Sequence, residues 1–382
     1  MGWTRRFFNC GPSMKSKNMQ TSIQPRSSPK FLISSKANRK GMDPDRVCHA
    51  RRVLKWLWSA KGILPVNIRV DDVICAKKDF INPGPSSSVV MKGLRPGPKG
   101  ASQPVALKCI LHHRNNRQDY ESTVKFFKTE VFAWLTLDHK NVIAFHGLDY
   151  SALGIGLPCL VLEWAENGSI LHCIRELESK KVDIPLNKWI GDIVEGLRYI
   201  HCEQIAHGDL RGANVLITED LTAKLSDLRL AKFVDTSGIT EHTGRSGAEK
   251  RWSSPEFVEQ ERRFGPGAGI PTIKGDVYSF GCLWLEIHTR REPYRDYAIS
   301  EVEEKLQTPG EYPDWPTSGL RSKDVETTKE KLRMSDAWQF VRRCLSHEPE
   351  DRPSTEELVC LQEFETFWMF EAYSTPSPGR RK

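Results

Sequence analysis

The chain has 382 residues and a formal net charge of +7, with 38% hydrophobic and 27% charged residues. This length exceeds what one simple core usually needs, so we expect a two-lobed folded unit with extensions. No apolar run reaches the roughly 18 residues that a membrane span requires, so no transmembrane segment is predicted. No apolar core follows the basic residues at the start of the chain, so no secretory signal is expected.

The positive charge is concentrated in the first part of the chain. Residues 1–65 hold 14 Lys and Arg but only 2 Asp and Glu, a balance of +12, and the remainder carries a balance of −5. Residues 1–41 lack any periodicity, which predicts a disordered basic arm. Such an arm is suited to contact acidic surfaces, and a solvated leader without a partner is the simpler alternative.

Residues 42–65 change character and are predicted to form an amphipathic helix and a linker. Apolar residues from Val47 to Trp58 recur at helical spacing, and Asp43 stands where an N-cap is expected. A helix docked on the folded body is favoured over one that lies on a membrane or binds a partner.

The ten cysteines are scattered from Cys10 to Cys360, and no two of them form a C-x-x-C pair. Neither a disulfide framework nor a zinc site is indicated by this spacing. We therefore expect reduced thiols and a cytoplasmic location, with the nucleus as the alternative.

Periodicity along the middle of the chain predicts strands first and helices later. Strands are expected at 104–111 and 158–164, with a helix at 121–137 between them. Helical periodicity then dominates, and the predicted helices cover 185–202, 274–290 and 335–346. This order indicates an α+β fold with a small strand-rich lobe followed by a larger, mainly helical lobe.

The stretch HGDLRGANVLITEDLTAKLSDLRL, residues 207–230, carries the candidate chemistry. It places Asp209, Asn214 and Asp227 on a frame of short apolar runs. Transfer of a phosphoryl group from ATP needs oxygen ligands for Mg²⁺ and a carboxylate that accepts the proton of the attacking hydroxyl. These three side chains supply both.

This stretch resembles the H-R-D-L-x-x-x-N and D-F-G motifs of eukaryotic protein kinases. The resemblance implies that Asp209 is the catalytic base and that Arg211 faces the γ-phosphate of ATP. It also implies that Asn214 and Asp227 hold Mg²⁺ or Mn²⁺. The expected ligands are therefore ATP, a divalent metal and a protein substrate.

Upstream segments extend the resemblance into the strand-rich lobe. In V-A-L-K, Lys108 would pair with the α- and β-phosphates, and Glu130 follows on the next predicted helix. The segment LVLEWAENGSI, residues 160–170, resembles the hinge that binds adenine. The residues implied to surround ATP are Val90, Ala106, Lys108, Glu130, Leu162 as gatekeeper, and the backbones of Glu163 and Ala165.

Downstream segments extend the resemblance to protein kinases into the helical lobe. RWSSPEF (251–257), KGDVYSFG (274–281) and EPEDRPS (348–354) resemble the end of the activation segment, a central helix and the last helical motif of the family. The resemblance implies an ion pair between Glu256 and Arg352, and it implies that Asp276 binds the backbone of the catalytic loop.

These matches imply a bilobal protein kinase fold of the α+β class. Its small antiparallel sheet with one main helix is expected at 66–163, and its mainly helical lobe at 166–370. A disordered tail is expected at 371–382.

The sequences of these motifs resemble those of tyrosine-kinase-like serine/threonine kinases of the type expanded in mushroom-forming fungi. The loop DLRGAN lacks the A-A-R-N and R-A-A-N patterns of tyrosine kinases, and its basic residue stands two places after Asp209. Transfer to Ser or Thr is therefore preferred over transfer to Tyr.

Three motifs depart from the family. The Gly-rich loop keeps only Gly84 and has Pro83 and Pro85, which lack the N–H groups that would bind phosphate, so weakened nucleotide affinity is expected. D-F-G is D-L-R here, and Arg229 lacks the backbone freedom of Gly. Gly208 replaces the Arg that contacts activation-segment phosphate in the family.

The departures leave two alternatives to an active kinase. The first is a pseudokinase scaffold, which keeps the fold but has weak or no catalysis. The second, more remote, is a small-molecule phosphotransferase of the aminoglycoside type, whose catalytic loop also favours Gly after the His.

Overall fold

The computed structural model describes residues 70, 72–81, 88–97, 100–110, 127, 130–135, 137–150, 159–233, 247–313 and 336–360. The predicted basic arm, the helix at 42–65 and the tail at 371–382 lie outside these residues. Residues 82–87, which hold most of the altered Gly-rich loop, also lie outside them. Within the described part of the chain, no helix combines the length and the apolar character that a membrane span requires.

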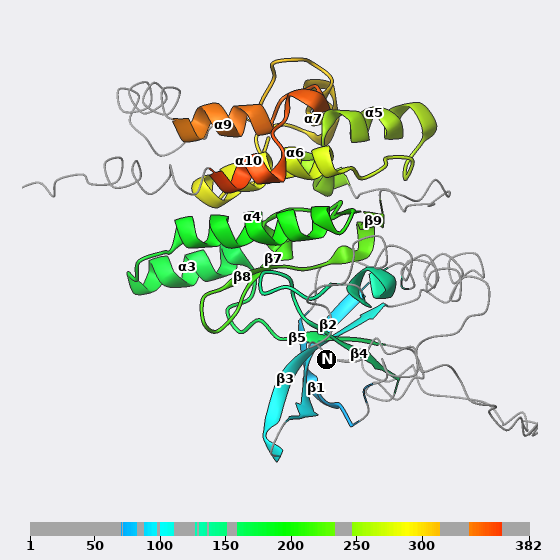
Figure 1. The fold of residues 1–382 in the computed structure, drawn as a ribbon, viewed down its shortest axis with the longest axis vertical. Helices are drawn as coiled ribbons and strands as arrows, with labels where there is room; N and C mark the ends of the chain where they lie inside the picture. Colours follow the sequence, from blue (N-terminus) through cyan, green and yellow to red (C-terminus); the bar gives the residue numbers. More distant parts are fainter. Residues whose placement is uncertain are drawn as a thin grey trace, which may run out of the picture. The chain divides into compact units, whose positions relative to one another are not determined.

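The first part of the chain forms an antiparallel sheet with the order β1-β2-β3-β5-β4 (Figure 1). Its strands are β1 Ile74–Ile81, β2 Ser88–Pro96, β3 Ser102–Ile110, β4 Phe145–Asp149 and β5 Cys159–Glu163. Residues 130–135 are helical and lie between β3 and β4 in sequence.

Strand β3 explains why this sheet can hold a charged residue. Val105, Leu107 and Cys109 point into a buried apolar cluster. Because side chains alternate along a strand, Ala106 and Lys108 project from the opposite face of the sheet. Lys108 therefore lies away from the apolar cluster and is available to the rest of the chain.

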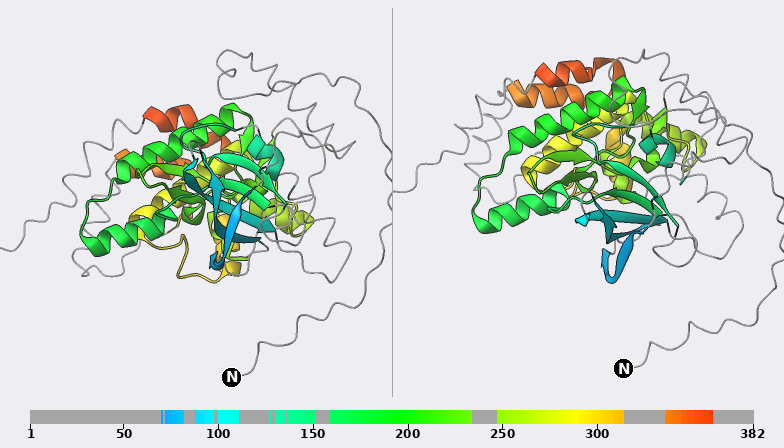
Figure 2. Two further views of the ribbon diagram at one scale, coloured as in Figure 1. Left: turned by 90° about the horizontal axis from the view of Figure 1, so that it is seen from below. Right: turned by 60° about the horizontal axis from the view of Figure 1, so that its bottom comes forward.

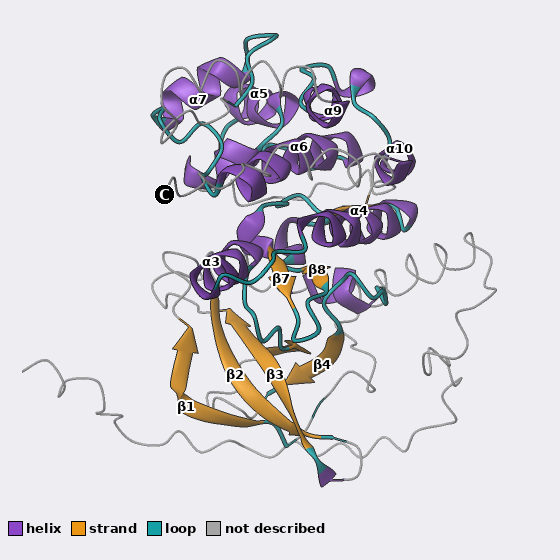
Figure 3. Cartoon of the chain, turned by 90° about the vertical axis from the view of Figure 1, so that its left-hand side faces the viewer, coloured by secondary structure: helices purple, strands orange, loops and turns teal. Residues whose placement is uncertain are grey.

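The second part of the chain is mainly helical, as Figure 3 shows. Its helices are α3 Ile170–Lys180, α4 Leu186–Cys202, α5 Pro255–Phe264, α6 Ile273–Thr289, α7 Ile299–Leu306, α9 Asp336–Cys344 and α10 Thr355–Cys360. Residues 275–287 of α6 are all buried, which is typical of a helix at the centre of a large domain. The hydroxyl of Thr272 caps the start of α6 by accepting from the Gly275 N–H at 2.9 Å.

Short strands and 3₁₀ turns connect these helices. β6 Ile205–Ala206 pairs with β9 Lys232–Phe233, and β7 Val215–Ile217 pairs with β8 Ala223–Leu225. The 3₁₀ segments are η3 Gly212–Asn214, η4 Leu228–Leu230, η5 Gly247–Trp252 and η6 Pro349–Asp351. Figure 2 shows the same ribbon from two further directions, with the helices in green, yellow, orange and red.

The predicted fold class is confirmed, since a small antiparallel sheet precedes a larger helical part. The strands expected at 104–111 and 158–164 appear as β3 and β5. The expected helices at 185–202, 274–290 and 335–346 appear as α4, α6 and α9, with ends that differ by no more than two residues.

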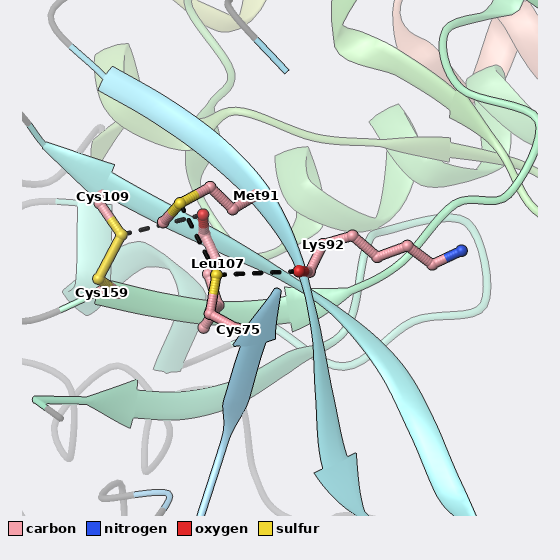
Figure 4. Close-up of a disulfide and its surroundings, with 6 residues drawn as sticks. All are labelled: Cys75, Met91, Lys92, Leu107, Cys109 and Cys159. Atoms are coloured by element: carbon pink, nitrogen blue, oxygen red, sulfur yellow. Dashed lines mark hydrogen bonds between the residues drawn. A yellow bond between two sulfur atoms is a disulfide. The ribbon is translucent and has the colours of Figure 1, made fainter. Parts of the chain in front are cut away.

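The expectation that the thiols are reduced is wrong for one pair. Cys109 and Cys159 form a disulfide that joins β3 to β5 (Figure 4). They are direct partners in the antiparallel register, with Cα atoms 4.5 Å apart, which suits a disulfide. Sequence spacing missed the pair because 50 residues separate the two cysteines and only the sheet brings them together. Free cysteines among the described residues include Cys173, Cys202 and Cys344.

Candidate active site

The loop from residue 207 to 214 is anchored by a carboxylate of helix α6. Asp276 accepts the His207 N–H at 2.7 Å and the Gly208 N–H at 2.9 Å, and its Oδ2 lies 2.8 Å from Nε2 of His201. Burial alone would raise the pKa of Asp276, but the His201 ring and these donors hold it below its usual value. Asp276 therefore stays ionised and fixes the start of the loop.

Gly208 is required by the backbone that Asp276 holds. Its φ is +79°, a conformation that L side chains rarely adopt. A Cβ built there would lie 2.6 Å from the Leu230 carbonyl oxygen and 3.0 Å from Pro271. The backbone conformation is therefore a reason for glycine at this position, in addition to the loss of the contact that an Arg would have made.

Replacing Gly208 with alanine is expected to lower the free energy of unfolding by about 2–3 kcal/mol, as the φ penalty and the clash act together. The matched control is Gly100→Ala, because Gly100 has the same φ of +79° but no atom within 4 Å of its Cβ position. The control should lose only about 1–2 kcal/mol. Denaturant unfolding measures both, and equal losses would show that the contact with Leu230 is unimportant.

His207 and Asn214 hold Asp209 from two sides. Nδ1 of His207 accepts the Asp209 N–H at 3.2 Å, so Nε2 carries the proton and donates to the Ser226 carbonyl oxygen at 3.0 Å. The Asn214 amide donates to the backbone oxygen of Asp209 at 2.7 Å and to its carboxylate at 2.8 Å. The carboxylate of Asp209, which is 2% exposed, therefore has a fixed orientation.

Lys108 joins the sheet to the segment after β8. Its Nζ lies 2.7 Å from a carboxylate oxygen of Glu130 and 2.7 Å from one of Asp227. Burial lowers the pKa of Lys108, but the two carboxylates outweigh burial and raise it above its usual value. The ammonium is therefore charged. Asp227, two residues after the end of β8, has a φ of +58°, a backbone conformation that non-glycine residues rarely adopt.

Ser226 and Asn214 connect the loop that holds Asp209 to the segment that holds Asp227. Ser226, the neighbour of Asp227, donates its N–H to the Asn214 carbonyl oxygen at 2.9 Å and its hydroxyl to the same oxygen at 3.0 Å. The base candidate Asp209 and the metal-ligand candidates Asn214 and Asp227 thus belong to one bonded frame. Their carboxylate and amide oxygens are the hard ligands that Mg²⁺ prefers.

A family model described as protein tyrosine and serine/threonine kinase matches residues 78–361. The chain belongs to this protein kinase family. A mitogen-activated protein kinase kinase kinase, mkh1 of Cytospora mali, is 28% identical over 232 residues. The match covers 60% of this chain but only 11% of that relative, so most of the relative has no counterpart in the match.

The residues that the family resemblance places around adenine share one face of the sheet. Val90 is the register partner of Lys108, and Ala106 is the partner of Leu162. Direct partners in an antiparallel pair project to the same side, so all four lie on the face opposite the apolar cluster. At the hinge, the Glu163 N–H already donates to the Ala144 carbonyl oxygen at 2.9 Å.

The Glu163 side chain is also engaged, because Lys224 Nζ lies 2.7 Å from its carboxylate. The Ala165 carbonyl accepts the Gly168 N–H at 3.1 Å. The expected adenine contact of Glu163 therefore does not include its own N–H.

Arg211 contacts two carboxylates. Its Nε lies 3.5 Å from the Asp209 carboxylate, and its Nη2 lies 3.2 Å from Glu249 in η5. Its guanidinium also lies over the Trp252 ring, 5.9 Å from the centroid. Arg211 thus connects the catalytic loop to the end of the activation segment. Sequence reasoning did not single out Glu249, because no motif marks it.

The predicted ion pair between Glu256 and Arg352 is present. Nη1 and Nη2 of Arg352 each lie 2.8 Å from a different oxygen of Glu256. The same guanidinium donates to three backbone carbonyls, those of Ser346, Lys274 and His347, at 2.8, 3.0 and 2.9 Å. All five N–H groups of Arg352 are thereby used, and the residue is 1% exposed.

Two further residues of the site were missed from the sequence. His201 shares Asp276 with the catalytic loop, and Glu286 of α6 accepts the Gly212 N–H at 2.8 Å. Glu286 is a charged residue within a helix that is buried all round, and a charge in such an apolar helix is the signal that could have identified it.

Proposed function

We propose that this family member is an active protein kinase that transfers the γ-phosphoryl group of ATP to Ser or Thr hydroxyls of a protein substrate. The observation that carries the proposal is the position of Lys108, 2.7 Å from both Glu130 and Asp227. This pairing requires strand β3, the helical residues 130–135 and the segment after β8 to lie next to one another. A chain without catalysis has no need to keep all of these groups together.

The roles of the loop residues follow from their contacts. Asp209 accepts the proton of the substrate hydroxyl, and its orientation is fixed by the Asn214 amide at 2.8 Å. Asn214 then offers its remaining amide oxygen, and Asp227 a carboxylate oxygen, to a divalent cation. Bound ATP and Mg²⁺ supply the phosphoryl group and neutralise part of its charge.

Two charged groups of the chain act on the phosphates themselves. Lys108 is the ammonium that orients the α- and β-phosphates, and its raised pKa keeps it charged across the neutral range. Arg211 lies 3.5 Å from the base and would turn from Asp209 to the γ-phosphate when substrate binds. Its place two residues after Asp209 supports Ser or Thr as the acceptor.

The experiment measures phosphate incorporation from Mg-ATP into a generic basic protein, followed by phosphoamino-acid analysis. We expect phosphoserine and phosphothreonine from the wild type and none above background from Lys108→Met. The matched control is Lys188→Met, because Lys188 is half-exposed on α4 and contacts Asp192 and the Leu221 backbone, which have no role in the proposed site. Phosphotyrosine alone would contradict the acceptor class.

The pseudokinase alternative keeps its support from Pro83, Pro85 and Arg229. No phosphate incorporation by the wild type, together with a nucleotide-dependent rise in melting temperature, would favour it. Faster phosphorylation of a small hydroxylated compound than of any protein would favour the small-molecule alternative. A cytoplasmic or nuclear location, and contact of residues 1–41 with acidic surfaces, remain proposals that rest on sequence alone.

A further inference from the structure

One buried carboxylate has no part in the mechanism above. Glu286 lies near the end of helix α6 and is 3% exposed. Its Oε2 accepts the Gly212 N–H of the catalytic loop at 2.8 Å and the Trp252 indole N–H at 2.8 Å. Gly212 follows Arg211 directly, and Trp252 ends η5. A single oxygen atom thus binds two segments that are 40 residues apart in sequence.

The loop is shaped to admit this carboxylate. A Cβ on Gly212 would lie 3.0 Å from Cδ and Oε1 of Glu286 and 3.1 Å from Oε2. Few real Cβ atoms approach other atoms so closely, so the absence of a side chain at Gly212 is what lets the carboxylate reach the backbone. This accounts for the glycine in DLRGAN.

We propose that Glu286 is a positioning residue, whose carboxylate holds the catalytic loop and the end of the activation segment in register through Gly212 and Trp252. The inference rests on the proposed kinase function. Arg211 lies next to Gly212 and over the Trp252 ring, so the same register sets its distance to Asp209. The carboxylate therefore acts on the base through the segments it binds and touches no reacting atom.

Charge makes this bond both strong and sensitive to pH. An ionised carboxylate accepts a stronger hydrogen bond than a neutral acid does. Burial raises the pKa of Glu286 to about 7, although the Gly212 and Trp252 donors and the Arg211 charge oppose this rise. The bond to the loop consequently strengthens as the pH rises through neutrality.

The charged and titratable groups near this carboxylate come from the catalytic loop, η5, α6 and the segment after α6. From the catalytic loop Arg211 faces the carboxylate, and it is itself paired with Glu249 of η5. After α6, Glu292 adds a like charge that raises the pKa of Glu286, and it lies 3.8 Å from Arg251. On α6 itself, burial lowers the pKa of His288 to about 4, so that ring is neutral.

The decisive variant is Glu286→Gln, which keeps the shape but never ionises. We expect its kcat to fall about 10-fold at pH 8 while KM for ATP changes less than about twofold, because alignment and not nucleotide binding is affected. The wild-type rate should fall about fivefold from pH 8 to pH 6, beyond any fall that the variant shows. Glu292→Gln, which removes a half-exposed neighbour, should keep the wild-type slope with its midpoint at slightly lower pH.

A second readout does not need activity. The folded-state pKa lies above the ordinary value of 4.5, so the folded protein binds this proton more tightly and loses stability as the pH rises from about 4.5 to 7. The melting temperature of Glu286→Gln minus that of the wild type should therefore increase by about 2–4 °C between pH 6 and pH 8. An inactive wild type that shows this shift would contradict the proposed function and leave the buried charge established.

Trp252→Phe removes the second hydrogen bond to the Glu286 carboxylate, the one from the indole N–H. It keeps an aromatic ring under Arg211 but removes the N–H donor, so the midpoint of the pH profile should move upward. An unchanged profile in both Glu286→Gln and Trp252→Phe, with no pH-dependent difference in melting temperature, would overturn the inference. If Glu286→Gln does not fold, Trp252→Phe alone tests the inference. An upward shift of its midpoint would support the inference, and no shift or a downward shift would overturn it.

Discussion

Replacing Arg352 with methionine is expected to lower the free energy of unfolding by about 3–5 kcal/mol. The change leaves the Glu256 carboxylate without its bidentate partner at 2.8 Å. It also removes the donors to three backbone carbonyls, and leaving such groups unsatisfied adds a cost to the folded state. Methionine keeps most of the apolar volume, so the loss reflects the guanidinium and not a cavity.

Denaturant unfolding of the wild type and the variant measures this difference. The matched control is Arg343→Met, because Arg343 forms a single exposed ion pair with Glu357 at 3.1 Å and should contribute only about 0–1 kcal/mol. Similar losses in the two variants would contradict the importance of burial for the Arg352 pair. The expected loss is structural, so it should appear equally in the presence and absence of nucleotide.

The helices of this fold could be predicted because their apolar residues have a strong period. Helix α4, predicted at 185–202, runs over Leu186–Cys202, and its buried residues recur at helical spacing. The β3 strand was found for the same reason, since Val105 and Leu107 alternate with smaller or polar residues. In each case the signal lies within one segment, so long-range contacts were not needed to detect it.

Contacts between segments were predictable only where a family motif linked them. The pair of Glu256 with Arg352 was expected from the family motifs and is present. Motif order also singled out Lys108 and Glu130, and the structure brings Nζ of Lys108 to 2.7 Å from the Glu130 carboxylate. The disulfide between Cys109 and Cys159 was not expected, because strand register decides it and register cannot be read from cysteine spacing.

Single residues that break a motif were the hardest to interpret. From the sequence, Gly208 indicated the loss of a phosphate contact, whereas the structure adds a backbone reason, its φ of +79°. Leu228, which replaces the Phe of D-F-G, is fully buried, so an apolar side chain still fills this position. The side chain of Arg229 lies outside the described residues, so its effect on the D-L-R segment stays a prediction.

Replacing Asp209 with asparagine is expected to lower kcat for the protein substrate by about 10²–10⁴-fold, the usual contribution of a general base. The amide has nearly the same shape and can still meet the Asn214 side chain, so the loop should keep its geometry. It cannot accept the proton of the attacking hydroxyl. Lys108, Asn214 and Asp227 are untouched, so nucleotide binding should persist.

The measurement compares phosphate incorporation with the nucleotide-dependent shift in melting temperature for the same two proteins. Asp209→Asn should lose the first and keep the second, which separates the chemical step from binding. Asp296→Asn is the control, since that carboxylate is exposed and pairs with Arg291 at 2.6 Å, away from the proposed site residues. A variant rate within about twofold of the wild type would exclude Asp209 as the base. Equal background rates in the two proteins, with the melting shift retained in both, would make this chain a nucleotide-binding scaffold.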